Sequence, residues 1–266
     1  MCPIVDSHCH IYPEKIAERA VESIGKFYDI EMSNGGTVAD MVKSEHEAGV
    51  THCIVFSVAT KVAQVESINK FIASEVEKSN GFMTGLGTLH PDSPDMAGDV
   101  EHLLSLGLKG VKLHPDIQGF KIDDYRCLKI YELCEKHGIP VLLHTGDTRY
   151  DFSNPNRVKP ILDTYTDLTV IGAHLGGWSM WDTAVDTLGG YKNFYVDCSS
   201  SLYAISPEKA TEVIRAYGAE RVMFATDYPM WSPKDELERF NKLDLTNEER
   251  EQILYKTATK LFKLSL

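Results

Sequence analysis

Residues 3–10 of this chain read Pro-Ile-Val-Asp-Ser-His-Cys-His, an apolar run that closes on two histidines one residue apart. Side chains two positions apart on a β-strand point to the same side. His8 and His10 can therefore hold one metal ion together if residues 3–9 form a strand. Such a pair becomes a metal site when the rest of the chain brings further ligands to the same place.

Apolar runs that end in a histidine or a carboxylate recur along the chain. His144 ends the run 140–144, His174 ends the run 169–174 and Asp227 ends the run 222–227. The strand-like runs are eight in all: 3–9, 52–58, 83–89, 108–114, 139–144, 168–174, 194–198 and 221–227. Amphipathic helical patterns lie between them, for example over 37–48, 62–78, 124–137 and 207–217. Runs that are apolar on both faces and alternate with helices predict a closed parallel barrel, the (β/α)8 TIM barrel of the α/β class.

An open doubly wound sheet is the alternative, but no glycine-rich phosphate loop follows the first run. In a barrel the carboxyl ends of the strands form the catalytic face, so we expect a metal site at the C-terminal mouth. With no linker-like stretch in the chain, we expect a single domain over residues 1–266. Residues 11–50 are too long for one crossover helix. They predict two helices with a break at Gly35-Gly36, partly covering the mouth.

Two pairs of residues predict helix starts. Ser206 before Pro207 is typical of an N-cap followed by proline at the first helical position. Thr246 with Glu249 is typical of a capping box that opens the C-terminal helix.

The composition excludes several classes of partner. The formal net charge is −12, whereas nucleic acids and anionic membranes require basic surface. No apolar run approaches the ~20 residues of a membrane span, and the N-terminus does not resemble a signal peptide. The six cysteines have no framework spacing, which indicates reduced buried thiols in a cytoplasmic protein. We expect a small-molecule substrate, and leave monomer and homodimer open.

The strand-end residues suit a catalytic metal centre. Zinc binds histidine nitrogen and carboxylate oxygen, and a catalytic site keeps one position for water, whose pKa falls to about 7. The predicted ligands are His8, His10, His144 and Asp227. The first and last strands of a closed barrel are neighbours, which brings Asp227 beside the histidine pair. Asp227 can also carry a proton, while His174 can be a further metal ligand, a general acid–base, an electrostatic stabiliser or a structural hydrogen-bond partner.

Four further residues are candidates for metal or substrate binding. Lys112 and His114 share a strand parity that points both inward. Lys112 could be carbamylated and bridge two metals, pair with a substrate anion or pair with a buried carboxylate. Arg149 could hold a substrate carboxylate, with a solvated loop arginine as the alternative. Trp178 could wall the pocket or serve the core.

Five segments of the chain together resemble the amidohydrolase superfamily, above all its aminocarboxymuconate-semialdehyde decarboxylase-like branch. The segments are residues 6–10 (Asp-Ser-His-Cys-His), 110–115 (Gly-Val-Lys-Leu-His-Pro), 143–146 (Leu-His-Thr-Gly), 172–177 (Gly-Ala-His-Leu-Gly-Gly) and 225–229 (Ala-Thr-Asp-Tyr-Pro). The resemblance implies a (β/α)8 barrel with one divalent metal, commonly zinc, on His8, His10, His144 and Asp227. It also implies that His174 acts on the metal-bound water or the substrate. Lys112 and His114 are not ligands in the decarboxylase-like pattern, although relatives with a carbamylated lysine use this strand, so the number of ions stays open.

These observations predict a metal-dependent hydrolase that uses an activated water on an amide, a lactone or a related carbonyl compound. A metal-dependent carboxy-lyase acting on an unsaturated carboxylic acid is the first alternative, because the same centre can protonate a carbon as the carboxylate leaves. A metal-binding protein without catalysis is the second. The expected cofactor is a divalent metal, zinc first, with manganese, cobalt or nickel as alternatives.

Overall fold

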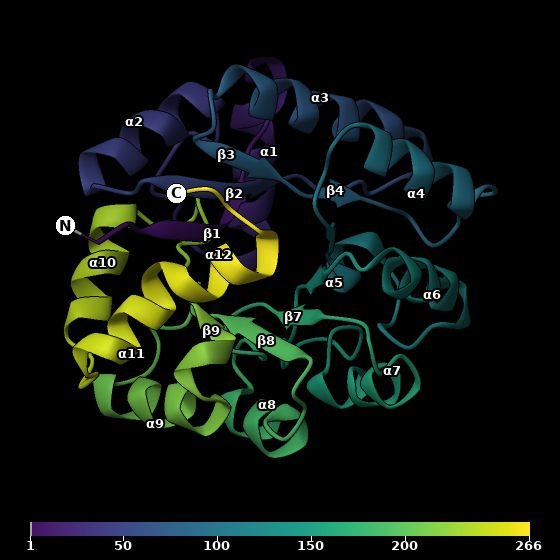
Figure 1. Ribbon diagram of the computed structural model, residues 1–266. Helices are drawn as coiled ribbons and strands as arrows, with labels where there is room; N and C mark the ends of the chain where they lie inside the picture. Colours follow the sequence, from purple (N-terminus) through teal and green to yellow (C-terminus); the bar gives the residue numbers. More distant parts are fainter. Residues whose placement is uncertain (1) are drawn as a thin grey trace.

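Parallel strands form a closed barrel in the computed structural model, which describes residues 2–266 (Figure 1). The strands are β1 (Val5–His10), β2 (His52–Phe56), β3 (Met83–Gly85), β4 (Gly87–Thr88), β5 (Val111–Leu113), β6 (Val141–Leu143), β7 (Val170–Gly172), β8 (Phe194–Asp197) and β9 (Val222–Met223). β3 and β4 are two parts of one barrel position, interrupted at Leu86, whose N–H donates to the Val55 carbonyl. The nine labelled strands thus fill eight positions, and the predicted (β/α)8 barrel is confirmed.

The first and last strands close the barrel. The Ser7 N–H donates to the Phe224 carbonyl (3.0 Å), and the His10 N–H donates to the Tyr228 carbonyl (2.7 Å). The buried Asp6 carboxylate reinforces the join, because it accepts hydrogen bonds from the Thr226 N–H and hydroxyl. Every other neighbouring pair of strands is parallel. The closure places the end of β1 beside the segment that follows β9.

Helices follow the strands and surround the barrel. They are α1 (Glu14–Tyr28), α2 (Val38–Ala48), α3 (Val65–Lys78), α4 (Met96–Ser105), α5 (Pro115–Gln118), α6 (Leu128–His137), α7 (Lys159–Thr164), α8 (Trp181–Leu188), α9 (Pro207–Tyr217), α10 (Pro233–Asn241), α11 (Asn247–Glu251) and α12 (Thr257–Phe262). Short helical turns are η1 (Val62–Gln64), η2 (Tyr125–Cys127), η3 (Pro155–Arg157) and η4 (Ala219–Arg221), and η5 (Gln252–Lys256) is a π-helix. Within residues 2–266, no helix combines the length and apolar character that crossing a bilayer requires.

The predicted helix starts are confirmed. The Ser206 hydroxyl caps α9, and Thr246 and Glu249 form a capping box that opens α11. The segment before residue 50 contains two helices as expected, with Gly36 in the turn between them at φ 75°. Figure 1 looks onto the end of the barrel that α11 and α12 cross, and α1 lies behind the strands.

The barrel interior is apolar at one end and polar at the other. Side chains such as Val5, Ile54, Leu142 and Met223 fill it, and Phe262 of α12 packs on this cluster at the N-terminal end of the strands. A second apolar cluster lies between the strands and the outer helices. The polar side chains that end the strands therefore face the opposite opening, the C-terminal mouth.

Glu236 on α10 is a buried carboxyl group whose Oε2 has no hydrogen-bond partner in residues 2–266. Burial, opposed by its ion pair with Arg239, raises the pKa of Glu236 from 4.5 to about 7. Between these values the folded protein keeps a proton that the unfolded chain has lost. The free energy of unfolding therefore falls as pH rises from 4.5 to about 7, by up to about 3 kcal/mol from this group.

We expect Glu236→Gln to remove this decline, so that the variant is more stable than the parent at pH 8 but not at pH 5. Urea unfolding at the two pH values measures the difference. Glu238→Gln, an exposed change on the same helix, is the control. An equal loss of stability between pH 5 and 8 in the Glu236 variant and the parent would contradict the expectation.

Candidate active site

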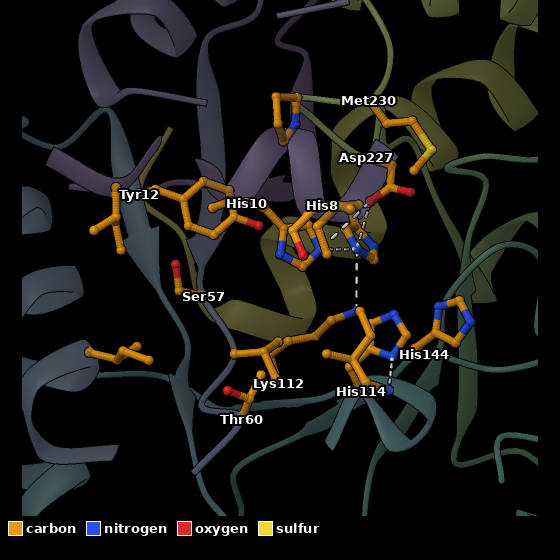
Figure 2. Close-up of a pocket in the computed structure, with 18 of the residues that line it drawn as sticks. His8, His10, Tyr12, Ser57, Thr60, Lys112, His114, His144, Asp227 and Met230 are labelled. Carbon is orange, nitrogen blue, oxygen red and sulfur yellow. Dashed lines mark hydrogen bonds and ion pairs between the residues drawn. The ribbon is translucent and has the colours of Figure 1, made fainter. Parts of the chain in front are cut away.

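The strand ends at the C-terminal mouth open into one cavity of about 410 Å³ (Figure 2). The five residues that the sequence placed at strand ends all line it, and so does the inward-pointing Lys112: His8, His10, His144, His174, Asp227 and Lys112. His114 lines it as well, whereas Arg149 and Trp178 do not. Helices α1 and α3 and the loops after β2 and β9 form the upper walls.

A backbone irregularity aims both histidines of β1 inward. Val5 already points into the barrel, so regular alternation would turn His8 outward. The pairing between β1 and β2 shifts register between Asp6 and Cys9, which supplies the extra residue. His8 and His10 consequently both face the mouth, and Cys9 packs in the cluster outside the barrel, as its position between them predicted.

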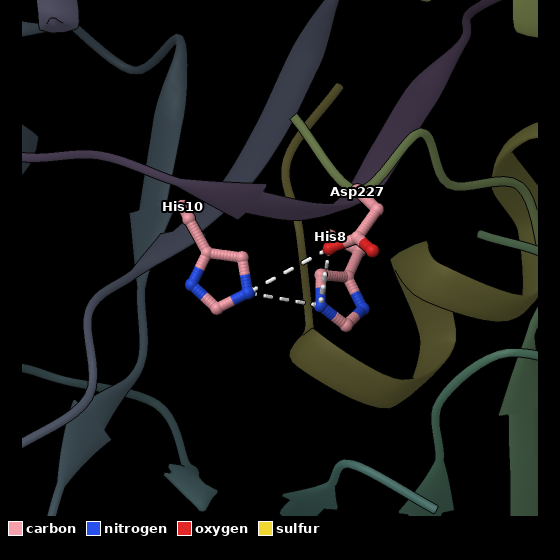
Figure 3. Close-up of side chains that lie close together, drawn as sticks. All are labelled: His8, His10 and Asp227. Atoms are coloured by element: carbon pink, nitrogen blue, oxygen red, sulfur yellow. Dashed lines mark hydrogen bonds and ion pairs between the residues drawn. The ribbon is translucent and has the colours of Figure 1, made fainter. Parts of the chain in front are cut away.

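His8, His10 and Asp227 converge on one point (Figure 3). His8 Nε2 lies 3.3 Å from His10 Nε2 and 3.3 Å from Asp227 Oδ1, and His10 Nε2 lies 3.7 Å from Asp227 Oδ1. Atoms bound to zinc at about 2.05 Å with tetrahedral angles are about 3.3 Å apart. The two rings are inclined at 49°, so their lone pairs can converge. The spacing and the donor types both fit a divalent metal ion.

Protonation favours metal binding by the same residues. Burial, with His8 and Lys112 nearby, lowers the pKa of His10 well below its ordinary value, so the imidazole is neutral. Burial alone would raise the pKa of Asp227, but His8, His174 and the Ser200 hydroxyl outweigh it and lower the pKa. A neutral imidazole and an ionised carboxylate are the forms that bind metal.

His144, the predicted fourth ligand, lines the cavity but lies outside this three-residue group. Its Nδ1 is 2.9 Å from His174 Nε2, and its Nε2 is 3.1 Å from the Gly146 carbonyl oxygen. The four-ligand set therefore stays a prediction, with three of its members together. The contact between His174 and His144 is consistent with a role of His174 in orienting the His144 ring. The part of His174 in proton transfer stays a prediction.

His144 also belongs to a second group of potential ligands with His114 and Asp116. The His114 and His144 rings are stacked, with centroids 4.0 Å apart and an interplanar angle of 7°. Lone pairs of parallel rings run side by side and do not converge on one ion. The geometry thus favours the His8, His10 and Asp227 group as the metal centre.

Asp197, which the sequence analysis did not single out, organises the floor of the site. Its Oδ2 lies 2.8 Å from His8 Nδ1, and its Oδ1 accepts hydrogen bonds from the backbone N–H groups of His174 and Ser199. A carboxylate on the far nitrogen of a ligand histidine sets its tautomer and ring orientation. With Asp197 on Nδ1, the Nε2 lone pair of His8 faces His10 and Asp227.

Left-handed backbone conformations occur at several residues of the mouth, among them His174 (φ 60°), Ser200 (φ 45°) and Asp227 (φ 63°). Non-glycine residues are uncommon in this region and carry backbone strain there, and such strain clusters at functional sites.

Ser200 orients Asp227, because the Ser200 hydroxyl donates a hydrogen bond to Asp227 Oδ2 at 2.5 Å. Trp231 Nε1 donates in turn to the Ser200 oxygen. The second carboxylate oxygen of Asp227 is thereby held, while Oδ1 faces the histidines.

Lys112 points inward from β5, as its parity predicted. Its Nζ lies 3.2 Å from His8 Nε2 and 5.2 Å from the centroid of the Phe56 ring. Burial lowers the pKa of Lys112 to about 8, against the opposing effect of Asp197 and Asp227. Within residues 2–266 Lys112 forms no close ion pair with a carboxylate, and its role stays a prediction.

Tyr28, at the end of α1, reaches down to the histidines. Its hydroxyl lies 2.8 Å from His114 Nε2 and 3.4 Å from His144 Nε2. In the sequence Tyr28 is one more aromatic residue of a helical pattern, and no local signal marks it. The structure thus adds a phenol, delivered by the helix over the mouth, to the predicted site residues.

Arg149 and Trp178 lie next to Tyr28 but do not line the cavity. Arg149 forms a bidentate ion pair with Asp147 and donates from Nη1 to the Phe27 carbonyl at 2.7 Å. Its guanidinium lies 5.3 Å from the Tyr28 ring and 5.5 Å from the Trp178 ring. Both residues hold the end of α1 in place.

Comparisons with known proteins agree with this architecture. Residues 5–264 match the model of the amidohydrolase family. No curated protein sequence matches the chain. An uncharacterized TIM-barrel protein of Bordetella bronchiseptica superposes with a TM-score of 0.83 at 21% identity, covering 98% of both chains.

Two similar structures are decarboxylases. The 5-carboxyvanillate decarboxylase of Sphingomonas paucimobilis has a TM-score of 0.78 at 15% identity, with full coverage of both chains. The dihydroxybenzoic acid decarboxylase of Polaromonas sp., with bound manganese and 2-nitroresorcinol, has a TM-score of 0.77 at 18% identity. This superposition covers 99% of the present chain and 97% of the other. At these identities the likeness establishes the fold.

Proposed function

The chain belongs to the amidohydrolase family, and from that premise we propose that it is a metal-dependent carboxy-lyase acting on an unsaturated or aromatic carboxylic acid. The observation that carries the proposal is the distribution of charge in the cavity. Of the Asp, Glu, Lys and Arg side chains in residues 2–266, those that line it are Lys112 and Asp227, both at the floor, and the walls are mainly apolar. An acid with a flat apolar body and one carboxylate matches this arrangement. The decarboxylases with the same fold lend support.

The metal is proposed to lie on His8, His10 and Asp227, with His144 as the further ligand. A divalent ion there would act as a Lewis acid toward substrate oxygens. Manganese is as consistent with these ligands as the zinc expected from the sequence, and a decarboxylase of the same fold binds it. His8 is kept in its ligand orientation by Asp197 whichever ion binds.

The floor residues suit the steps of a decarboxylation. The Lys112 ammonium attracts the substrate carboxylate toward the floor. The C–C bond to the carboxylate then breaks, carbon dioxide leaves, and the electron pair stays on the substrate carbon, where a conjugated system spreads it. That carbon must gain a proton, which comes from water: the ionised Asp227 carboxylate would accept a proton from a water molecule at the floor and pass it to the carbon. The apolar walls exclude water and so strengthen these electrostatic contacts.

Hydrolysis of an amide or lactone, which the sequence placed first, uses the same residues and is the competing function. The two reactions differ in what happens to the substrate carboxylate. A hydrolase keeps it, whereas a carboxy-lyase replaces it with one hydrogen from solvent. The structural neighbours support the lyase better than the hydrolase.

The test is product analysis in deuterated water. The manganese- and zinc-loaded enzymes are incubated with aromatic and unsaturated acids carrying ¹³C in the carboxylate, and with lactones and amides. We expect labelled carbon dioxide and a product with one deuterium at the carbon that lost the carboxylate. Asp227→Asn should abolish both signals, while Asp167→Asn, an exposed change of the same kind, should not. Hydrolysis of a lactone or amide, with no labelled carbon dioxide released from any of the acids, would show that the enzyme is a hydrolase.

A further inference from the structure

The upper part of the cavity has walls of a different chemistry from its floor. Helix α1 presents Ile16, Ala20 and Ile24 to it, residues spaced four apart and therefore on one helix face. Helix α3 presents Ile68 and Phe71, three apart. Both helices are rich in charged residues, and none of these lines the cavity.

The apolar walls are open to the cavity and incompletely packed. Ile24, Ile68 and Phe71 are each only partly buried, and Ile16 at the rim is 40% exposed. Ile68 and Phe71 pack partly against the protein core, and the rest of their apolar surface faces the cavity. The cavity volume of about 410 Å³ lies within the range of pockets that enclose drug-sized ligands, and a single-ring acid on the floor leaves the upper part unfilled.

The polar residues of the upper part are already engaged or exposed. Gln64 Oε1 accepts hydrogen bonds from the Thr60 and Lys61 N–H groups and from the Thr60 hydroxyl. Ser23 and Ser67 lie at the exposed edge. Among residues 2–266, no charged side chain in this part of the cavity can recognise a second charge on a ligand. The ligand chemistry that fits is an uncharged apolar chain.

We infer that α1 and α3 form an apolar subsite for an uncharged tail, so that the substrate is an amphiphilic acid that extends well beyond a single ring. The inference rests on the proposed function in taking the head group to be a carboxylate at the floor. The tail runs from Lys112 upward between Ile24 and Ile68 and ends near Ile16. Small acids with a second charged group are excluded from this subsite.

Binding of saturated straight-chain carboxylates of two to ten carbons tests the inference, because these acids have no conjugated system and do not decarboxylate. Calorimetry with the manganese-loaded enzyme measures Kd for each length. A fully buried methylene contributes about 0.8 kcal/mol, which corresponds to about fourfold in Kd. We expect Kd to fall by about fourfold per added carbon until the chain reaches the rim, and then to level off.

Two variants locate the effect. Ile24→Gln and Ile68→Gln each place an amide in the subsite and should weaken binding of the ten-carbon acid by about tenfold or more, with little change for the two-carbon acid. Leu128→Gln, at a part-exposed leucine of α6 away from the cavity, should change neither. Ile68→Val should retain the length dependence, which separates loss of the subsite from misfolding.

The outcome is independent of carbon dioxide release. A Kd that does not change with chain length, or a length dependence that survives both glutamine substitutions, would overturn the subsite even if the enzyme decarboxylates a small acid. The expected length dependence would stand even if the enzyme proves to be a hydrolase of long-chain substrates.

Discussion

Replacement of His10 by alanine is expected to reduce bound divalent metal from about one equivalent to a small fraction and to lower turnover by well over 100-fold. His10 Nε2 is one of three donor atoms that lie 3.3–3.7 Å apart, and its loss would remove one of the proposed ligands of the ion. Loss of a residue that hydrogen-bonds to a metal ligand already lowers metal affinity or activity by about 10–100-fold, and loss of a ligand itself should cost more. Elemental analysis of protein purified without added metal measures the content directly.

Thermal unfolding offers a second measurement of the same effect. Metal at about 100 times its Kd stabilises the folded state by about 2.7 kcal/mol if it does not bind the unfolded chain. Titration of the metal-free parent with zinc, manganese or cobalt should raise the Tm, and His10→Ala should lose this response. His137→Ala, at an exposed histidine of α6, is the control. A metal-free parent that gains neither stability nor activity with any of the three ions would rule out the metal centre.

Substitution of His174 is expected to separate turnover from metal binding. His174 is not in the group formed by His8, His10 and Asp227, but its Nε2 lies 2.9 Å from His144 Nδ1. We expect His174→Ala and His174→Asn to keep nearly stoichiometric metal and to lose about 10²–10⁴-fold in rate, the usual contribution of a proton-transfer group. His144→Ala should lose both metal and activity.

Metal content and kcat measured on the same preparations decide between the roles of His174. Asparagine can keep a hydrogen bond to His144, so a structural role predicts that His174→Asn retains much more activity than His174→Ala. A role in proton transfer predicts that both variants are equally impaired. If either variant loses its metal, His174 is a ligand, the centre is binuclear, and Lys112 becomes the candidate for the bridge.

The strands were predictable because nearly all of their residues are buried and several of them end close to a polar side chain at the mouth. The runs ending at His144, His174 and Asp227 correspond to β6, β7 and the segment after β9. Parity alone also predicted that Lys112 and His114 point into the cavity, which is confirmed.

The site residues that were not predicted depend on contacts between distant parts of the chain, and no local sequence pattern indicates such contacts. Asp197 ends β8 in the same way as the recognised residues, but the buried Cys198 extends the apolar run past it and hides the signal. Tyr28 looks like a core residue of an amphipathic helix. Arg149 was a candidate anion site from its charge, and only the structure shows that Asp147, two residues earlier, occupies its guanidinium.

The closure of the barrel has a consequence for how the protein is made. His8 lies on the first strand and Asp227 follows the last, and the hydrogen bond that joins these strands spans 217 residues, from Ser7 to Phe224. The ion can thus bind all of its proposed ligands only after residue 227 has been synthesised and has left the ribosome. Metal binding is then a late step in folding, and the bound ion would join the first strand to the segment after the last one. Any fluctuation that parts β1 from β9 also opens the metal site, so the rate of metal loss would report on the opening of the barrel itself.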